Sequence, residues 1–296
     1  MTGGVIVLDK PPGISSFGAV QAARRILREK KCGHAGTLDP AATGVLPICI
    51  GPATKIAGYI SENDKEYEAQ FSFGVSTDTG DACGKPIETR HGAWAPESEV
   101  AAAISGLVGT FAQTPPSYSA VKVGGVRSYK LARRGEEAPL APRMVTVFAA
   151  RLLCWSEAGF RIVVSCSKGF YIRALSRDLG AALGAPMTLV SLKRLRVGDF
   201  GIDQAVTLDD LRELAALGRE RERMISIPDA LSRMSKWVTP PDAAVAVRNG
   251  KLAGSWLAGC VASERSDTAL LITDDGHPLA IAGRTPSGLW KILRGI

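Results

Sequence analysis

Residues 33–40, with the sequence GHAGTLDP, contain the side chain best suited to chemistry, Asp39. The proline that follows disfavours helical backbone angles at Asp39, which predicts an extended residue at the start of a turn. If Pro40 opens a short helical turn, free N–H groups there would favour the ionised carboxylate. Such a carboxylate can act as a nucleophile in glycosyl chemistry, as in retaining glycosidases. From residue chemistry alone, an aspartate at this position is more often a capping residue than a catalytic one.

The sequence lacks the patterns that mark other kinds of functional site. The start of the chain has neither a P-loop ending nor a Gly-x-Gly-x-x-Gly pattern, which argues against a nucleotide-binding loop. Residues 78–81 match only half of a calcium loop. The six cysteines stand singly and the three histidines lie far apart, so the sequence predicts no metal site and no disulfide framework. We therefore expect reduced thiols and a cytoplasmic protein.

The overall charge favours a polyanionic partner such as nucleic acid. Lysine and arginine number 36 against 29 aspartates and glutamates, with a pI near 9.2. The longest uncharged stretch, residues 100–121, is interrupted by polar residues and prolines and predicts no membrane span. No basic segment precedes an apolar run at the N-terminus, so secretion is not expected.

Strands and helices must both position these residues. Residues 5–8, 66–73 and 161–165 have the apolar or alternating patterns of strands. Ser16 can cap a helix, and a second helix is expected over residues 170–183. Because the two element types do not alternate strictly, the pattern predicts an α+β fold with a mixed or antiparallel sheet.

The helix after Ser16 ends in a run of cations whose role the sequence leaves open. Cations are mildly favourable at a helix C-terminus, so a solvated helix end explains them. A surface that faces RNA explains them equally well. The cations are Arg24, Arg25, Arg28, Lys30 and Lys31.

The chain is expected to divide into residues 1–235 and a smaller unit of residues 237–296. The stretch WVTPP, residues 237–241, can continue neither a helix nor a central strand. Short strand-like runs with turn residues between them predict a small β-barrel or sandwich. These runs are residues 243–247, 269–273 and 279–282.

Residues 33–40 closely resemble the catalytic-aspartate motif of the TruB-type tRNA pseudouridine synthases. These enzymes isomerise uridine 55 in the T arm of tRNA without a cofactor. Further matching blocks follow in order, and the likeness spans roughly residues 3–232. The blocks are LDKP (8–11) with SS (15–16), GPATK (51–55), DKEY (64–67), DT and D (78–79 and 81), PSYSAVK (116–122), CSKGFYIR (166–173) and LKRL (192–195).

The resemblance implies three catalytic residues, Asp39, Tyr67 and Arg173. Asp39 would be the nucleophile, and it needs a nearby cation because an unpaired buried carboxylate tends to take up a proton. Arg173 would supply that cation through two hydrogen bonds. Tyr67 would stack on the target base. Without the resemblance, Arg173 reads as a surface arginine and Tyr67 as a tyrosine at the edge of the core.

The resemblance also implies the residues that bind substrate. A uridine in a folded arm must be flipped out before its glycosidic bond is reachable, and His34 would take its place in the stack. Tyr171 and Leu192 would contact the flipped nucleoside, although Leu192 by itself reads as a core residue.

Residues 115–143 read as a flexible basic loop, and the resemblance implies that this insertion clamps RNA. Its phosphate contacts would give affinity without sequence information and make binding depend on salt. The residues expected to bind substrate there are Lys122, Lys130 and Arg133.

These expectations describe a pseudouridine synthase fold of the α+β class with a small C-terminal β-barrel-like domain of the PUA type. We expect a monomer that acts on the T arm of tRNA with no cofactor, no metal, no membrane and no obligate protein partner. Two alternatives stay open: an RNA-binding protein without chemistry, and a guide-dependent synthase that acts on ribosomal RNA.

Overall fold

The computed structural model describes residues 3–119, 121–128, 131, 134, 136, 139–252, 254, 256–263 and 266–296. Side chains at positions 122, 123, 127, 262 and 263 are not described. Within these ranges, no helix combines the length and the apolar character that crossing a membrane requires.

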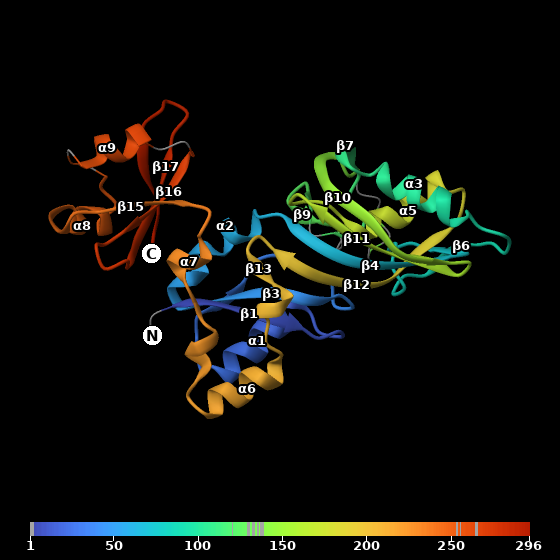
Figure 1. Cartoon of the computed structure of the whole chain (residues 1–296), viewed down its shortest axis with the longest axis horizontal. Coiled ribbons are helices and arrows are strands. Elements are labelled where there is room, and N and C mark those ends of the chain that lie inside the picture. The colour runs from blue at the N-terminus through green and yellow to red at the C-terminus, as the bar shows by residue number, and fades with distance from the viewer. Residues whose placement is uncertain are drawn as a thin grey trace.

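A large, mostly antiparallel sheet forms the centre of the molecule (Figure 1). Its strands pair in the order β14-β1-β3-β12-β4-β11-β10-β7, with β2 added to β3 and β13 added to β12. The pairing of β12 with β3 is parallel and the others are antiparallel. The strands are β1 (Gly4–Lys10), β2 (Cys32–His34), β3 (Thr43–Ile50), β4 (Lys65–Phe73), β7 (Gly109–Gln113), β10 (Arg143–Ser156), β11 (Gly159–Cys166), β12 (Met187–Val197), β13 (Phe200–Gly201) and β14 (Ile225–Ser226).

Helices and short hairpins flank this sheet. The helices are α1 (Ser16–Ile26), α2 (Ala57–Ser61), α3 (Glu97–Ser105), α5 (Ile172–Ala182), α6 (Leu208–Ala216) and α7 (Ile227–Ala230), with the 3-10 turns η1 (Gly51–Ile56), η2 (Ile202–Gln204) and η3 (Glu220–Arg223). The hairpins pair β5 (Val75–Thr77) with β6 (Pro86–Thr89) and β8 (Lys122–Val123) with β9 (Val126–Arg127).

Alternation along the strands divides the interior into separate apolar cores. In β1, Val5 and Val7 pack toward η1, α2 and α7, whereas Ile6 and Leu8 pack toward α1 and α6. A further core lies between α3, α5 and the strands β4, β10, β11 and β12. The alternating strand predicted around Tyr67 is confirmed, because its apolar residues point into this core. The α+β fold class is therefore confirmed.

The cap of α1 differs from the prediction. Ser15, and not Ser16, is the N-cap residue, and its hydroxyl accepts a hydrogen bond from the Gly18 N–H at 3.0 Å. Ser16 is buried in the first turn, where its hydroxyl contacts the backbone of Leu38. The sequence could not distinguish these adjacent serines, because either could precede the same apolar face.

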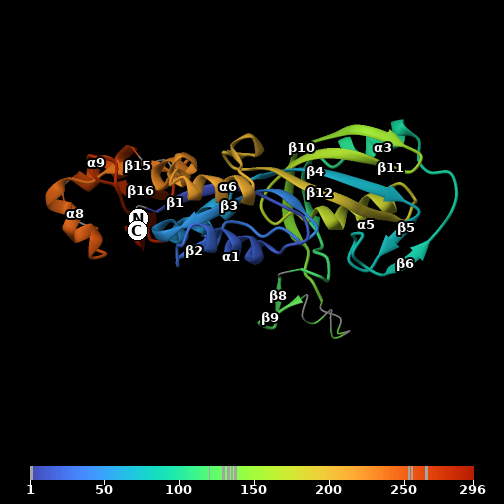
Figure 2. The same cartoon turned by 90° about the horizontal axis from the view of Figure 1, so that it is seen from below.

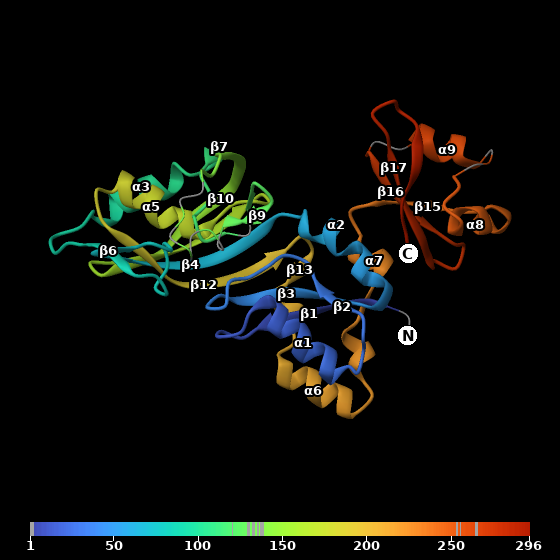
Figure 3. The ribbon, with the colours of Figure 1, turned by 180° about the vertical axis from the view of Figure 1, so that it is seen from behind.

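The last part of the chain forms a second sheet in the order β15-β16-β17-β18. Figures 1 and 3 show it beyond the end of the large sheet that holds β1 and β3, with α8 and α9 beside it. Leu270 and Ile281 of this sheet join the apolar core that contains Ile56 and Ile60. The elements are β15 (Ser235–Val238), α8 (Pro241–Arg248), α9 (Trp256–Ser263), β16 (Thr268–Ile272), β17 (Pro278–Arg284) and β18 (Trp290–Gly295).

The strand expected at residues 243–247 is wrong, because these residues belong to helix α8. Pro241 stands at the start of that helix, where a missing N–H costs nothing. Ala243, Ala244 and Val247 form its buried side, so the apolar run follows a helical period. The stretch at residues 237–241 also continues a strand for two residues, since Trp237 lies buried in β15.

Candidate active site

Asp39 lies in the loop between β2 and β3, and this loop is held by side chains from distant parts of the chain. Arg194 of β12 donates to the carbonyl of Gly36 at 3.0 Å and to that of Thr37 at 3.3 Å. Its Nε donates to the Val45 carbonyl at 2.7 Å. Arg194 is only 1% exposed, so these carbonyl oxygens take the place of water around its guanidinium.

The residues on either side of Asp39 are fixed as well. The Ser16 hydroxyl accepts from the Leu38 N–H at 2.7 Å and donates to the Leu38 carbonyl, 3.0 Å away. The Pro40 carbonyl accepts from Lys10 Nζ at 3.2 Å and from the Gly13 N–H at 2.9 Å. Burial lowers the pKa of Lys10, and the nearby Asp39 charge opposes that shift. The backbone on both sides of Asp39 is therefore held in place.

The Asp39 carboxylate pairs side-on with Arg173. Arg173 Nε lies 2.9 Å from Asp39 Oδ2, and its second contact reaches Oδ1 at 3.5 Å. The arginine side chain is 9% exposed and the carboxylate 42%, so the pair presents its negative end to solvent. The Asp39 side chain therefore pairs with Arg173, whereas the sequence had left open that it caps a helix.

Backbone carbonyls hold the other side of the guanidinium. Arg173 donates to the carbonyls of Tyr118 at 2.7 Å and Thr79 at 3.3 Å. Asp81 places a second carboxylate 3.8 Å from Nε. A group with these acceptors can stay charged while buried, and it has little freedom to turn away from Asp39.

Helix α5 brings Arg173 to this position because its apolar stripe packs on the large sheet. Leu175 and Leu179 lie in the core, which leaves Arg173 in the first turn facing the Asp39 loop. Gln113 fixes the start of the helix: its Oε1 accepts from the Tyr171 N–H at 2.9 Å and its Nε2 donates to the Tyr171 carbonyl at 3.3 Å. Gln113 is 3% exposed, so both halves of its amide are used inside the protein.

A small cavity of about 40 Å³ joins several predicted residues. Asp39, Arg173 and Leu192 line it, together with Asp81 and Val190. Val190 is exposed and lies at an irregularity in the pairing of β12 with β4, so the cavity lies next to this irregularity. The sequence-predicted nucleophile, its cation and the substrate-contacting leucine therefore meet in one place.

Tyr67 is not among the described residues that line this cavity. It stands opposite Arg194 in the pairing of β4 with β12, and it packs where two apolar cores meet. Burial raises the pKa of Tyr67; the Arg194 charge opposes this shift, and the Asp39 carboxylate adds to it. The phenol is therefore protonated at neutral pH.

His34 and Tyr171 are held near these elements by backbone pairing. His34 ends β2, and its Nδ1 is buried with no hydrogen-bond partner among the described residues. Burial and the Arg194 charge lower the pKa of His34, which favours a neutral imidazole. Tyr171 is the N-cap residue of α5, one residue before Ile172.

Residues of the insertion are described only in part. Lys122 begins β8, and the structure describes its backbone but not its side chain. Lys130 and Arg133 lie outside the described residues. The predicted substrate contacts of these three residues therefore stay predictions.

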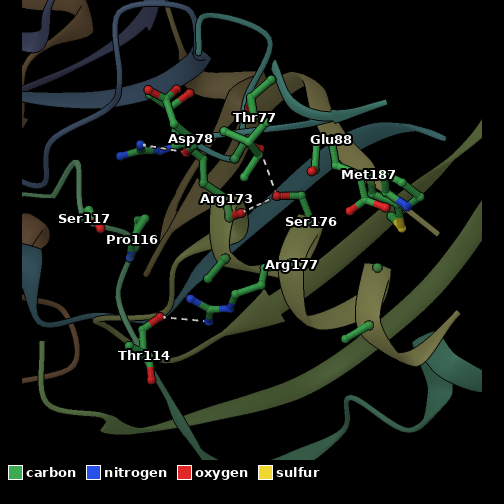
Figure 4. A pocket seen from close by; sticks show the side chains of 18 of the residues that line it. Thr77, Asp78, Glu88, Thr114, Pro116, Ser117, Arg173, Ser176, Arg177 and Met187 are labelled. Atoms are coloured by element: carbon green, nitrogen blue, oxygen red, sulfur yellow. Dashed lines mark hydrogen bonds between the residues drawn. The ribbon is translucent and has the colours of Figure 1, made fainter. Parts of the chain in front are cut away.

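Arg173 also lines a second cavity, of about 680 Å³ (Figure 4). Figure 4 shows Arg173, Ser176 and Arg177 on the helix that forms one wall. The Ser176 hydroxyl contacts the carbonyls of Gly80 and Arg173, and Arg177 donates to the Thr114 carbonyl at 3.1 Å. These bonds tie α5 to the start of the insertion and to the loop before Asp81.

Sequence reasoning assigned no role to several residues that build this site. Arg194, Asp81 and Lys10 stand in the matching blocks, so their place in the motifs was the available signal. Gln113 and the buried role of Ser16 gave no local signal, because each depends on a partner far along the chain. Within the described ranges, no cluster of His, Cys, Asp or Glu has the arrangement of a metal site.

Comparisons with known proteins show which family this chain resembles. Residues 24–172 match the sequence model described as TruB family pseudouridylate synthase (N terminal domain). Residues 173–246 match the one described as tRNA pseudouridylate synthase B C-terminal domain. The second match begins at Arg173 and crosses the boundary that we expected near residue 235.

Curated relatives are similar over most of their length. Proteins named tRNA pseudouridine synthase B are 42% identical in Mycobacteroides abscessus, over 92% of this chain and 93% of the relative, and 41% identical in Chromohalobacter salexigens, over 92% and 87%. The protein of that name in Bacillus subtilis is 40% identical over 85% of this chain and 84% of its own.

Solved structures share the fold. A chain in the crystal structure of the archaeal box H/ACA sRNP Nop10–Cbf5 complex matches with a TM-score of 0.71 and 25% identity, covering 95% of this chain and 79% of that chain. A chain in a Cbf5–Nop10–Gar1 complex matches with a TM-score of 0.73 and 26% identity, covering 95% and 78%. With its aspartate–arginine pair on this fold and its match to the family across both sequence models, the chain belongs to the TruB family of pseudouridylate synthases.

Proposed function

We propose that this protein converts uridine 55 in the T arm of tRNA to pseudouridine, with Asp39 as the nucleophile and without a cofactor. The observation that carries the proposal is the Asp39–Arg173 pair, joined at 2.9 Å in a loop held on both sides of the aspartate. The names of the bacterial relatives, all tRNA pseudouridine synthase B, support tRNA as the substrate.

The reaction is an isomerisation, so its atoms balance within the nucleoside. The C1′–N1 bond breaks, uracil turns, and a C5–C1′ bond forms. C5 loses its proton and N1 ends with one. Asp39 acts on the nucleoside to release the base, and it must be ionised to do so. Arg173 holds the carboxylate in one orientation, because carbonyls fix the guanidinium from its other side.

We assign Tyr67, Tyr171 and Leu192 to the flipped nucleoside. The Tyr67 ring would stack on the uracil, and the apolar Leu192 side chain lines the cavity beside Asp39. The neutral imidazole of His34 would fill the place that the base leaves in the RNA stack, which offsets part of the cost of flipping. His34 Nδ1, which has no hydrogen-bond partner among the described residues, would then form a hydrogen bond with RNA.

We further propose that residues 1–235 are the catalytic domain, that residues 115–143 clamp RNA through Lys122, Lys130 and Arg133, and that residues 237–296 are a PUA-type RNA-binding domain. The separate apolar core of the last sheet supports this division. The protein would act as a monomer in the cytoplasm. The described cysteines form no disulfide, which is consistent with that reducing compartment.

The test maps pseudouridine, position by position, in unmodified tRNA before and after incubation with the protein. We expect one new pseudouridine per tRNA, at position 55. Asp39→Asn keeps the side-chain shape and removes the negative charge, so it should bind tRNA and form no pseudouridine. Asp199→Asn is the matched control, because Asp199 pairs with Arg233 at the surface.

Two outcomes would contradict the proposal. Pseudouridine at the normal rate with Asp39→Asn would exclude Asp39 as the nucleophile. Tight tRNA binding without any pseudouridine would favour an RNA-binding protein. The likeness to chains from H/ACA complexes supports the alternative of guide-dependent modification. That alternative requires activity on ribosomal RNA to appear only when a guide RNA is added.

A further inference from the structure

The C-terminal end of α1 and the residues after it form an exposed basic patch. Glu29, the acidic residue within the patch, directs Oε1 to the Lys31 N–H at 3.0 Å. Among the residues that the structure describes, no cation of the patch forms an ion pair with a carboxylate. The basic patch consists of Arg24, Arg25, Arg28, Lys30 and Lys31.

Several arginines outside the patch are paired. On α6, which packs against α1, Arg212 pairs with Asp209, and beyond its end Arg219 contacts Glu222 at 2.7 and 2.9 Å. On the sheet, Arg161 contacts Glu68 at 3.3 Å. Like charges close together repel, so an unmatched group of cations is costly unless an anion covers it. The patch has the charge pattern of a polyanion-binding surface.

The backbone of Arg28 points to the same role. Its φ of 52° makes it the one non-glycine residue with positive φ in the described ranges. The Arg28 N–H donates to the Arg25 carbonyl, and the Glu29 N–H donates to the Arg24 carbonyl at 3.2 Å, so Arg28 occupies the left-handed position that ends the helix. Glycine adopts this conformation freely and arginine does not. Arg28 therefore stands at a position where glycine would give a more stable fold.

The position of the patch suits a partner that also reaches Asp39. Helix α1 begins at Ser16, which holds Leu38 beside Asp39, and its 11 residues span about 16 Å. Figure 2 shows α1 on the same side of the large sheet as β8 and β9, running toward the C-terminal sheet. The patch therefore lies roughly one helix length from the reacting base, on the side of the molecule that carries the insertion.

The positive surface continues toward the C-terminal sheet. The carbonyl of Lys31 accepts from the first N–H of η1 at 2.7 Å, which joins the patch to that turn. Lys55 of η1 and Arg294 of β18 line one surface groove of about 410 Å³. Glu62, the acid in this groove, pairs with Lys168. An extended polyanion on the patch would meet further cations in this direction.

We propose that the basic patch binds the phosphate backbone of the RNA stem next to the loop that carries the target uridine. This inference rests on the proposed function. Phosphate contacts carry no sequence information, but they set the position and orientation of a nucleic acid. The patch would hold the stem while Asp39 acts on the loop.

The first test compares Arg24→Ala/Arg25→Ala/Lys31→Ala with Arg212→Ala/Arg219→Ala, a control pair on α6 and just beyond its end. The probe is unmodified tRNA, bound at salt concentrations from about 50 to 200 mM. We expect the patch variant to lose about 10- to 100-fold in affinity and to lower the salt slope by about 2. The control should bind like the unaltered protein and keep its single-turnover rate.

The second test uses Arg28→Gly, which separates binding from folding. Because glycine relieves the left-handed backbone, this variant should raise the melting temperature by about 1–3 °C. It should also weaken tRNA binding by about 3- to 5-fold through the loss of one phosphate contact. A lower melting temperature with unchanged affinity would mean that Arg28 serves only the fold, and it would overturn the proposal.

A shortened RNA identifies the part of the substrate that the patch contacts. The same loop on a truncated stem should bind the unaltered protein and the patch variant with equal affinity. If the triple patch variant and Arg28→Gly both bind full tRNA with normal affinity while pseudouridine forms, the patch proposal is wrong and the proposed function stands. If no pseudouridine forms but the patch variant still loses tRNA binding, the proposed function fails and the RNA surface stands.

Discussion

At the residue scale, the site depends on an arginine that would be expected at the surface. By residue chemistry alone, Arg173 is an exposed cation in the first turn of a helix. The structure leaves it 9% exposed, because two carbonyls and the carboxylates of Asp39 and Asp81 surround its guanidinium. Burial of a charge is tolerated only with such partners. The same partners leave the guanidinium one orientation toward Asp39.

Replacing Arg173 with lysine tests this geometry. Lysine keeps the charge but cannot pair side-on with Asp39 while also donating to the Tyr118 and Thr79 carbonyls. We expect the single-turnover rate of pseudouridine formation to fall about 10²- to 10³-fold, with tRNA affinity changed only a few fold. Arg177→Lys, one turn further along α5 and largely exposed, is the control. A near-normal rate for Arg173→Lys would show that charge alone is sufficient.

At the scale of elements, α1 and β12 hold the loop that carries Asp39. Ser16 of α1 holds Leu38, and Arg194 of β12 holds Gly36 and Thr37. Strand β3 needs glycine directly after the loop, where it meets β12: a Cβ on Gly44, whose φ is 96°, would lie 2.2 Å from the Arg194 carbonyl oxygen. The loop is therefore rigid because separate elements converge on it.

The adjacent serines of α1 allow a matched comparison. Ser15→Ala removes a helix cap, whereas Ser16→Ala leaves the Leu38 N–H and carbonyl without their partner. Each change should lower the free energy of unfolding by about 1–2 kcal/mol in urea titrations. Only Ser16→Ala should also lower kcat, by about ten-fold, because a small displacement of a catalytic group is costly. Equal kcat values for the two variants would mean that the loop does not depend on Ser16.

At the scale of the whole molecule, the site lies where two apolar cores meet. Tyr67 and Leu192 each pack against the core beneath α5 and the core beneath α1. Strand β12 joins the two halves, since it pairs with β3 on one side and β4 on the other. Substrate at this junction would contact both halves of the sheet.

Thiols buried in two of the apolar cores also predict how stability responds to alkali. Burial raises the pKa of the Cys49 and Cys166 thiols from 9.0 to about 12. Between these values the unfolded chain has released protons that the folded protein keeps, so stability present below pH 9 is lost as the pH rises. We expect about 1.4 kcal/mol of loss per pH unit for each thiol.

Urea unfolding under reducing conditions, at a series of pH values above 8, measures this loss. Cys49→Ala/Cys166→Ala should have a shallower alkaline decline than the unaltered protein, even though its stability at neutral pH is lower. Cys83→Ala removes an exposed thiol and should leave the slope unchanged. Parallel declines in all three proteins would show that the buried thiols do not titrate in this way.

The sequence by itself determined the features that depend on neighbouring residues. Alternation predicted β4 and helical periodicity predicted α5, because each pattern is written in one short segment. The motif at residues 33–40 identified Asp39, and the ordered blocks identified the family. Short apolar runs were less reliable: residues 243–247 fit either element type, and Pro241 together with the packing of α8 selected the helix.

The tertiary structure alone decided what surrounds the carboxylate. Arg173 lies 134 residues from Asp39 along the chain, Arg194 lies 158 residues from Gly36, and Gln113 lies 58 residues from Tyr171. These partners meet because sheet register and helix packing place them together, and no local pattern encodes a register between distant strands. The sequence names the group that we propose reacts, and the fold supplies the charge and the hydrogen bonds that hold it.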